Sequence, residues 1–193
     1  MKEGMDEMIY VFLASGFEEI EALAVVDILR RAELEVQTVA VGVGEKTVRG
    51  AHGIPVVADV TEEQAKPEGL EMVVLPGGMP GTLNLEKSQT VQEFLQLASN
   101  NGLWIGAICA APSILGHNGL ADGKRVTCYP GFESQLTQSA YTAAPVEEDG
   151  RLITANGPGS AMDFGFLLAE KLTSKERAAM LKGAMQYENS CKK

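Results

Sequence analysis

The stretch LWIGAICAAP, residues 103–112, decides the fold that we expect for this chain. Its first six residues form an almost continuous apolar run, which predicts a strand buried on both faces of a sheet. Residues 110–115 predict a helix, because Pro112 suits a first helical turn, where its missing N–H leaves no hydrogen bond unmade. Cys109 therefore falls on a sharp turn between a strand and a helix, and we call this turn the nucleophile elbow.

Similar segments continue on both sides of the elbow. Strands are predicted at residues 8–14, 35–41, 70–75, 103–108 and 126–129, with a hairpin over 146–155 and two short extended pieces within 46–57. Helices are predicted at residues 18–32, 90–98, 110–115, 163–172 and 175–185. Strands that alternate with helices are typical of a doubly wound α/β fold, with a mostly parallel sheet and helices on both faces. No change of composition marks a linker, so we expect one domain over residues 1–193.

The first predicted helix carries apolar residues on more than one side. Ile20, Leu23 and Ile28 belong to one stripe, which we expect to face the sheet. Ala22 and Val25 lie outside this stripe, so a second side of the helix should also be covered, as in a homodimer.

Composition limits the classes of function. Lys and Arg number 16 against 26 Asp and Glu, so the net charge is −10, and no basic run offers a surface for phosphate groups. The apolar runs are too short to cross a bilayer, which takes about 20 residues. The charged residues 1–7 lack the apolar segment of a signal peptide, and three cysteines without a CxxC pair fit a reducing compartment. We therefore expect a cytoplasmic protein with no nucleic-acid or membrane partner and no zinc site of clustered Cys and His.

Cys109 is the strongest candidate for chemistry. In doubly wound folds the ligand crevice lies beyond the carboxyl ends of the strands, where Cys109 is expected. A helix N-terminus and its free amides favour a thiolate, so we expect a thiol pKa well below the ordinary value of about 8.5. The alternative is that Cys109 is only a small buried apolar residue. Peroxide should oxidise Cys109 before Cys191, which is its main competitor in a polar tail, while Cys128 has no assigned role.

Two further groups follow predicted strands. The amides of Gly77 and Gly78 could form an oxyanion hole, although a plain turn explains the two glycines equally well. Glu18, Glu19 and Glu21 lie in the first turn of the first helix, where the helix dipole alone favours acidic residues. A carboxyl group facing the crevice could hold a proton beside a thiolate, and the spacing leaves Glu18 and Glu21 as alternatives. No glycine pattern matches a nucleotide-binding loop, so we predict no nucleotide cofactor.

Together these motifs resemble those of the ThiJ/PfpI (DJ-one) superfamily, in particular its protein deglycase/YajL branch. The matching stretches follow the family's order: GFEEIE (16–21), VVLPGG (73–78), AICAAP (107–112), VTCYP (126–130) and GPGS (157–160). The resemblance implies a flavodoxin-like fold and a homodimer that needs no cofactor. It also implies that Cys109 is the nucleophile and Glu21 the protonated glutamate beside it. An oxyanion would bind the amides of Gly77, Gly78 and Ala110.

Three positions depart from the family's pattern. Ala110 stands where the peptidase-like branch has a histidine, so a Cys–His protease is not expected. Tyr129 takes the place of a histidine that is common near the thiol in the deglycase branch; a tyrosine donates a hydrogen bond but is a poor base. His52 falls where relatives carry an arginine from the partner subunit, and it could contact the site across a dimer.

The resemblance implies two functions that the residues alone do not separate. In the first, which we favour, the protein is a cofactor-independent glyoxalase- or deglycase-type enzyme. Cys109 would attack a small α-oxoaldehyde such as methylglyoxal, or its adduct on a glycated protein, and water would release a hydroxy acid. In the second, Cys109 is oxidised to a sulfinate that Glu21 stabilises, in an oxidative-stress sensor or chaperone. A thiamine-related role is implied only by the family's name.

Overall fold

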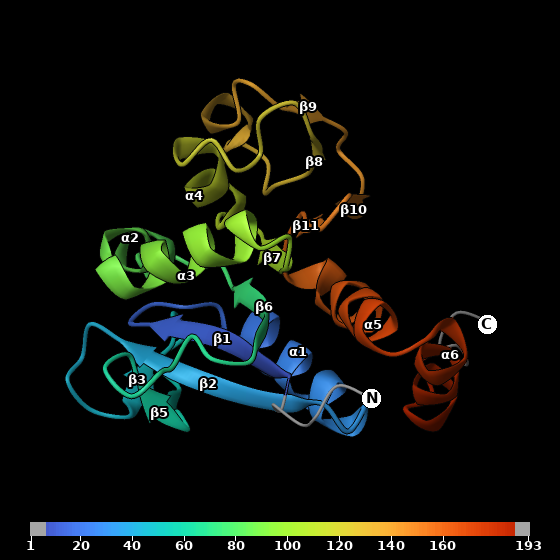
Figure 1. Cartoon of the computed structure of the whole chain (residues 1–193), viewed down its shortest axis with the longest axis horizontal. Helices are drawn as coiled ribbons and strands as arrows, with labels where there is room; N and C mark the ends of the chain where they lie inside the picture. The colour runs from blue at the N-terminus through green and yellow to red at the C-terminus, as the bar shows by residue number, and fades with distance from the viewer. Residues whose placement is uncertain (1–6, 188–193) are drawn as a thin grey trace.

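The computed structural model describes residues 7–187 and is built around a seven-stranded sheet (Figure 1). The strand order is β10-β11-β7-β6-β1-β2-β5. The strands are β1 (Met8–Ala14), β2 (Glu35–Val41), β5 (Val60–Thr61), β6 (Leu70–Leu75), β7 (Trp104–Ile108), β10 (Val146–Asp149) and β11 (Leu152–Ala155). Neighbouring strands run parallel except β10 and β11, which form an antiparallel hairpin. The predicted mostly parallel sheet is thereby confirmed.

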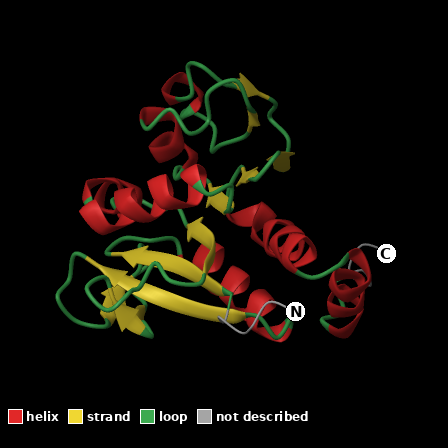
Figure 2. Cartoon of the chain, in the orientation of Figure 1, coloured by secondary structure: helices red, strands yellow, loops and turns green. Residues whose placement is uncertain are grey.

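Helices surround this sheet, and two small sheets lie outside it (Figure 2). The helices are α1 (Glu19–Arg31), α2 (Gly81–Lys87), α3 (Gln89–Asn100), α4 (Pro112–His117), α5 (Ala161–Leu172) and α6 (Lys175–Ala184). One small sheet pairs β3 (Thr47–Arg49) with β4 (Pro55–Val57), and the other pairs β8 (Arg125–Val126) with β9 (Ala140–Tyr141). Single 3-10 turns occur at η1 (Glu133–Gln135) and η2 (Pro158–Ser160).

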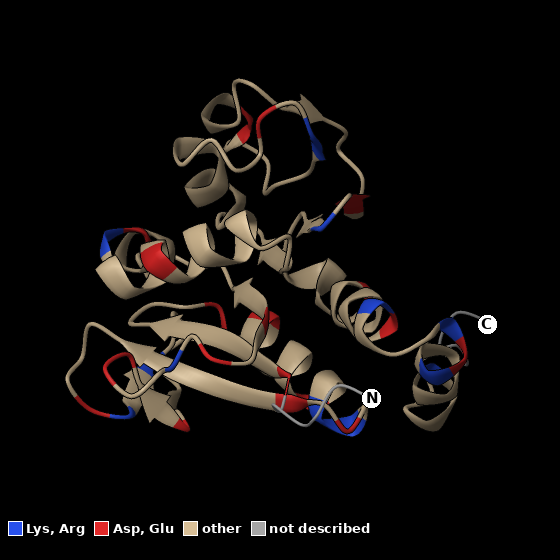
Figure 3. Cartoon of the chain, viewed as in Figure 1, with Lys and Arg blue, Asp and Glu red and all other residues tan. Residues whose placement is uncertain are grey.

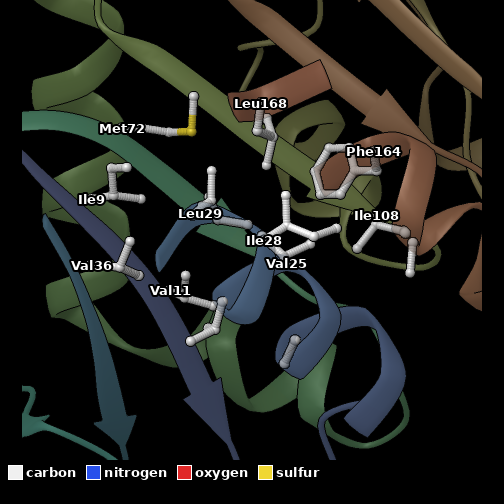
Figure 4. Close-up of a cluster of buried hydrophobic side chains, with 14 of the residues drawn as sticks. Ile9, Val11, Val25, Ile28, Leu29, Val36, Met72, Ile108, Phe164 and Leu168 are labelled. Atoms are coloured by element: carbon white, nitrogen blue, oxygen red, sulfur yellow. The ribbon is translucent and has the colours of Figure 1, made fainter. Parts of the chain in front are cut away.

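The side chains of β1 alternate between two hydrophobic clusters, one on each face of the sheet. Ile9 and Val11 belong to the cluster that includes α1 and α5, whose side chains gather around them in Figure 4. Tyr10 and Phe12 belong to the other cluster, with residues of α3 and α4. Successive strand residues point to opposite faces, so an unbroken apolar strand requires cover on both. The two helical layers thus follow from the apolar run of β1.

The carboxyl ends of three neighbouring strands meet at one edge of the sheet. β1 pairs with β2 on one side and with β6 on the other. The chain therefore adds strands first on one side of β1 and then crosses over to add the remaining strands on its other side. Such a reversal of strand order opens a crevice beyond the strand ends. The segments that follow β1, β6 and β7 carry Glu21, Gly77 and Cys109, respectively.

The predicted extent of the strand at residues 126–129 is wrong. Only Arg125–Val126 is a strand, and it pairs with β9 outside the main sheet. Beyond it, the Thr127 amide donates to Thr154 Oγ1 over 2.9 Å, and the Tyr129 amide donates to the Cys109 carbonyl over 2.8 Å. These bonds hold residues 127–129 against β11 and the end of β7 without a strand ladder.

The prediction that one apolar stripe of α1 faces the sheet is wrong in part. Ile20 and Leu23 are 56% and 37% exposed, whereas Ala22 and Val25 are fully buried. The reason is that α1 packs against α5 as well as the sheet, which moves its buried arc around the helix. An apolar strip therefore remains on its outer side.

Three short elements differ from the sequence prediction. Neither α2 nor β5 was predicted, because a helix of seven residues and a strand of two carry too few residues for a periodic pattern. The helix after the elbow begins at Pro112 rather than at residue 110. None of these differences moves the loops that follow β1, β6 and β7.

Charged residues of both signs are interspersed along the helices and loops (Figure 3). Several form exposed ion pairs, such as Arg31 with Asp27 over 2.7 Å, and solvent-exposed pairs of this kind contribute little to stability. Among residues 7–187, no helix combines the length and the apolar character needed to cross a membrane.

Candidate active site

Cys109 lies on the turn between β7 and α4 in a left-handed backbone conformation, with a φ of 65°. This conformation costs a residue other than glycine about 1–3 kcal/mol, so the surroundings must hold it. The Cys109 amide donates to the Ala155 carbonyl over 2.8 Å, and the Cys109 carbonyl accepts from the Tyr129 amide, also over 2.8 Å. The chain therefore forms the expected elbow and anchors it to two other segments.

Gly77 lies against Cys109 because it has no side chain. A Cβ atom at position 77 would lie 2.7 Å from Cys109 Cβ, 2.9 Å from Glu21 Oε2 and 3.0 Å from the Ala110 nitrogen. These distances are shorter than van der Waals contact, so only glycine lets the loop after β6 approach this closely. The same distances show that the cysteine, the glutamate and the Ala110 amide surround one point in space.

Glu21, rather than Glu18, is the carboxylate beside the cysteine. Its side chain has no exposed surface, and Oε2 accepts a 2.8 Å hydrogen bond from the Gly77 amide. No donor among residues 7–187 forms a hydrogen bond with Glu21 Oε1. Burial raises the pKa of Glu21 to about 7; the Cys109 thiol and the Gly77 amide lower it only in part, and the charge of Glu18 adds to the rise. Glu21 can therefore take up and release a proton near neutral pH.

The oxyanion donors differ in one respect from those that the resemblance implies. The Gly77 amide is already bonded to Glu21, so it is not free for a substrate oxygen. The amides of Gly78 and Ala110 instead hydrogen-bond the Cys109 sulfur. These two N–H groups therefore lie close to any carbon that bonds to that sulfur.

The prediction of a low pKa for the Cys109 thiol is wrong when Glu21 is ionised. Burial, the negative charge of Glu21 and its hydrogen bond raise the pKa of Cys109 to about 12, and the amides of Gly78 and Ala110 offset only part of this rise. The sequence argument counted the helix end and the amides, but not burial, which leaves Cys109 only 9% exposed. The thiol and the carboxyl group thus share one proton over a wide pH range, and a thiolate forms when this proton moves to Glu21.

Tyr129 flanks the elbow, whereas His52 contacts a different pair of carboxylates. The Tyr129 ring lies close to Gly157, where a Cβ atom would be 3.2 Å from Tyr129 Cδ2, and its side chain is half exposed. His52 Nδ1 lies 2.9 Å from Glu19 Oε2 and 3.6 Å from Glu18 Oε2. Both are contacts within one chain, and neither involves the thiol.

The His52 contacts change the titration of both partners. The hydrogen bond that the imidazole donates to Glu19 and the charges of Glu18 and Glu19 raise the pKa of His52. Burial raises the pKa of Glu19, but hydrogen bonds from the side chain and amide of His52 and from the Ile54 amide hold it below its ordinary value.

Two contacts of the site were not found from the sequence. The Ala155 carbonyl at the end of β11 holds the Cys109 amide, and only the sheet order brings these residues together. Gly78, with a φ of 88°, lies where a Cβ atom would be 2.4 Å from the Glu18 nitrogen and 2.5 Å from the Gly16 carbonyl oxygen. The available signal in the sequence for this close approach was the presence of glycines in the loops after β1 and β6, at Gly16 and Gly78.

The Cys109 side chain has little contact with solvent, since the residue is only 9% exposed. A pocket of about 530 Å³ lies beyond the ends of β1 and β2, between Ser15, Gly42, Asn84 and Ser88. Its lining includes neither Cys109 nor Glu21. The limited exposure of the sulfur therefore favours a reactant of a few heavy atoms.

Comparison with known proteins identifies the family. The sequence profile of the DJ-1/PfpI family matches residues 7–171, which include the elbow and both loops beside it. The chain belongs to the DJ-1/PfpI family. Protein dj-1beta of Drosophila melanogaster is 37% identical over 175 residues, which cover 90% of this chain and 93% of that protein. The resemblance drawn from the motifs is thereby confirmed.

Other members of the DJ-1/PfpI family share the fold and include an enzyme. The crystal structure of Drosophila melanogaster DJ-1beta matches with a TM-score of 0.89 at 35% identity, covering 94% of this chain and 98% of that one. The glutathione-independent glyoxalase DJR-1.2 of Caenorhabditis elegans is 32% identical over 166 residues, which cover 85% of this chain and 87% of that protein. The flavodoxin-like α/β fold predicted from the sequence is confirmed.

Proposed function

We propose that the protein is a cofactor-independent enzyme of the glyoxalase or deglycase type, with Cys109 as its nucleophile. Its substrates are small α-oxoaldehydes such as methylglyoxal, or the adducts that they form on proteins. The observation that carries the proposal is the Cys109–Glu21 pair, which lies on a strained elbow beside the amides of Gly78 and Ala110. The family relative that is named a glutathione-independent glyoxalase supports the same class of reaction.

The reaction begins when the Cys109 thiol passes its proton to Glu21. The sulfur bonds to the aldehyde carbon, and the carbonyl electron pair moves to oxygen, where the amides of Gly78 and Ala110 stabilise the negative charge. Protonation of this oxygen gives a hemithioacetal. Attack by a thiolate rather than a thiol is required because the thiolate is the nucleophilic form of cysteine.

Glu21 then moves a proton within the bound molecule. It removes the proton from the former aldehyde carbon and returns a proton to the neighbouring ketone carbon. The hydroxyl proton of the hemithioacetal passes to the former ketone oxygen, so the second carbon becomes an alcohol carbon and the first becomes the thioester carbonyl. The first carbon is oxidised to a thioester and the second is reduced, so no external oxidant or reductant enters. Water attacks the thioester, the C–S bond breaks, and lactate leaves as the sulfur regains its proton. A carboxyl group with a pKa of about 7 suits transfers in both directions.

The test is formation of lactate from methylglyoxal in buffer free of glutathione and cofactors. We expect lactate from the wild-type protein and none above background from Cys109→Ser. Cys128→Ser is the matched control, because Cys128 is a fully buried thiol elsewhere in the chain and its loss should leave most activity. Equal rates in Cys109→Ser and wild type would overturn the proposal.

The same contacts favour a second candidate function, in which Cys109 is a peroxide sensor. Two equivalents of hydrogen peroxide would convert the thiolate to a sulfinate and release two waters, and the amides of Gly78 and Ala110 would hold the sulfinate oxygens. Mass spectrometry of lightly oxidised protein should find this product on Cys109 before Cys191, which lies outside the described residues. Oxidation at Cys109 without lactate formation would favour the sensor over the enzyme.

We further propose that the protein acts as a cytoplasmic homodimer. Ile20 and Leu23 on α1 are exposed, and so is Ile54, whose amide lies 3.4 Å from Glu19 Oε1 at the start of the same helix. A group of large apolar side chains at one place on the surface is typical of an interface. Free thiols at Cys109 and Cys128 fit a reducing compartment.

A further inference from the structure

Glu18, Glu19 and His52 form a cluster at the start of α1 that the proposed reaction does not use. His52 Nδ1 lies 2.9 Å from Glu19 Oε2 and 3.6 Å from Glu18 Oε2. One ligand atom from each of the three residues lies within 4.8 Å of the other two. The histidine follows the glutamates by more than thirty positions, so no short metal-binding motif marks the cluster in the sequence.

We propose that this cluster binds a zinc ion through Glu18 Oε2, Glu19 Oε2 and His52 Nδ1. In a tetrahedral zinc site with ligands at about 2.0–2.2 Å, neighbouring ligand atoms lie about 3.3–3.6 Å apart. The distance from His52 to Glu18 already has this value. The distance from His52 to Glu19 has to open by only a few tenths of an ångström, which a small side-chain rotation provides.

The chain holds Glu19 in the orientation that a ligand needs. Glu19 is 5% exposed, and its Oε1 accepts hydrogen bonds from the amides of His52, over 2.9 Å, and Ile54, over 3.4 Å. Oε2 is thereby directed to the position shared with the imidazole, as in metal sites whose ligands are oriented by outer hydrogen bonds. Gly50 makes room for this carboxylate, since a Cβ atom at position 50 would lie 2.3 Å from Glu19 Oε1.

The donor set selects the class of ion. An imidazole nitrogen with two carboxylate oxygens suits zinc, whereas magnesium and calcium prefer oxygen ligands alone. The two carboxylates balance the charge of a divalent ion. The His52 side chain is 67% exposed in the single chain, so the fourth position is open to water or to a group of the partner in the proposed homodimer. Zinc would replace the proton between Nδ1 and Glu19 Oε2, and this proton would pass to solvent.

Calorimetric titration of zinc ions tests the proposal directly. The sample is untagged, metal-free, full-length protein carrying Cys109→Ser and Cys191→Ser, so that neither of these thiols supplies a ligand. We expect one zinc per chain. His52→Asn or Glu19→Gln should each weaken binding by at least about tenfold, because even changes to outer hydrogen-bond partners cost about 10–100-fold.

His117→Asn is the matched control, since it removes the other of the two histidines, which pairs with Glu86, and it should leave the affinity unchanged. Circular dichroism checks that each variant is folded, and Glu18→Gln replaces Glu19→Gln if the latter unfolds. No zinc binding, or equal affinity after His52→Asn, would overturn the site. Because the test protein lacks the nucleophile, its result is independent of whether the proposed enzymatic activity exists.

Discussion

Gly77 donates its backbone N–H to Glu21 Oε2 over 2.8 Å and so holds a fully buried carboxyl group beside the elbow of Cys109. Position 77 has no room for a Cβ atom, because the same loop touches both the glutamate and the cysteine. The consequence is electrostatic. Burial raises the pKa of Glu21 to about 7, while burial and the charge of Glu21 raise the pKa of Cys109 to about 12. The two groups therefore titrate as one unit.

Glu21→Gln should abolish lactate formation yet make the thiol more reactive. The substitution removes the negative charge that raises the pKa of Cys109. Alkylation by iodoacetamide at about pH 9, followed at Cys109 by peptide mass spectrometry, should become at least about tenfold faster, which corresponds to a pKa lower by one unit or more. Slower alkylation than in wild type would show instead that Glu21 stabilises the thiolate as a protonated donor. Glu35→Gln, at an exposed position on β2, serves as the control.

The buried carboxyl group should make stability depend on pH. The pKa of Glu21 is raised from 4.5 to about 7 on folding, so its contribution is fully present below pH 4.5 and is lost as the pH rises through about 7. The free energy of unfolding of wild type, relative to Glu21→Gln, should fall by about 3 kcal/mol between about pH 4.5 and pH 8. Urea unfolding of both proteins at the two pH values measures this difference. A difference that stays constant with pH would contradict the raised pKa.

Gly77→Ala should damage the site and destabilise the fold. Its Cβ atom would lie 2.7 Å from Cys109 Cβ, so the loop or the elbow must move, at a cost of about 1–3 kcal/mol. Gly159→Ala is a matched control, because no heavy atom lies within 4 Å of a Cβ there. Thermal unfolding and lactate assays on the two variants should separate them clearly. Equal stability and activity would show that the loop after β6 does not hold the pair.

Leu23→Asp should convert a dimer to a monomer. Leu23 lies on the exposed apolar side of α1, where a charge would have to be buried in the proposed interface. Light scattering should give about twice the chain mass of 20.5 kDa for wild type and about that mass for the variant. Met180→Asp places the same charge on an exposed residue of α6 and should stay dimeric. A monomeric wild type would contradict the proposed interface.

Long apolar runs made most of the fold predictable. The segment 8–14 is a continuous apolar strand, and 70–75 is apolar except at Glu71. Each coincides with its predicted range, because strands buried on both faces leave few polar positions. The meeting of the loops that carry Gly77 and Cys109 follows from the rule that ligands bind beyond the ends of parallel strands. Glu21 was chosen over Glu18 only through the family resemblance, and the structure now supplies the contact that distinguishes them.

Properties that depend on three-dimensional contact could not be predicted. The thiol pKa was predicted in the wrong direction because burial and the charge of Glu21 outweigh the amides at the elbow. The exposed side of α1 depends on packing against α5, which begins only at Ala161. A contact so distant in the sequence leaves no local signal at Ile20. The pairing of His52 with Glu19 joins distant segments through a turn between β3 and β4.

The number of lactate molecules formed per chain tests the central claim most directly. Wild type and Glu21→Gln are incubated with excess methylglyoxal in metal-free buffer without glutathione, and lactate is counted over time. We predict many lactate molecules per wild-type chain, at a rate that depends on Cys109, and none above background from Glu21→Gln. Lactate limited to one molecule or fewer per wild-type chain, or continued turnover by Glu21→Gln, would contradict an enzyme that works through the shared proton of Cys109 and Glu21.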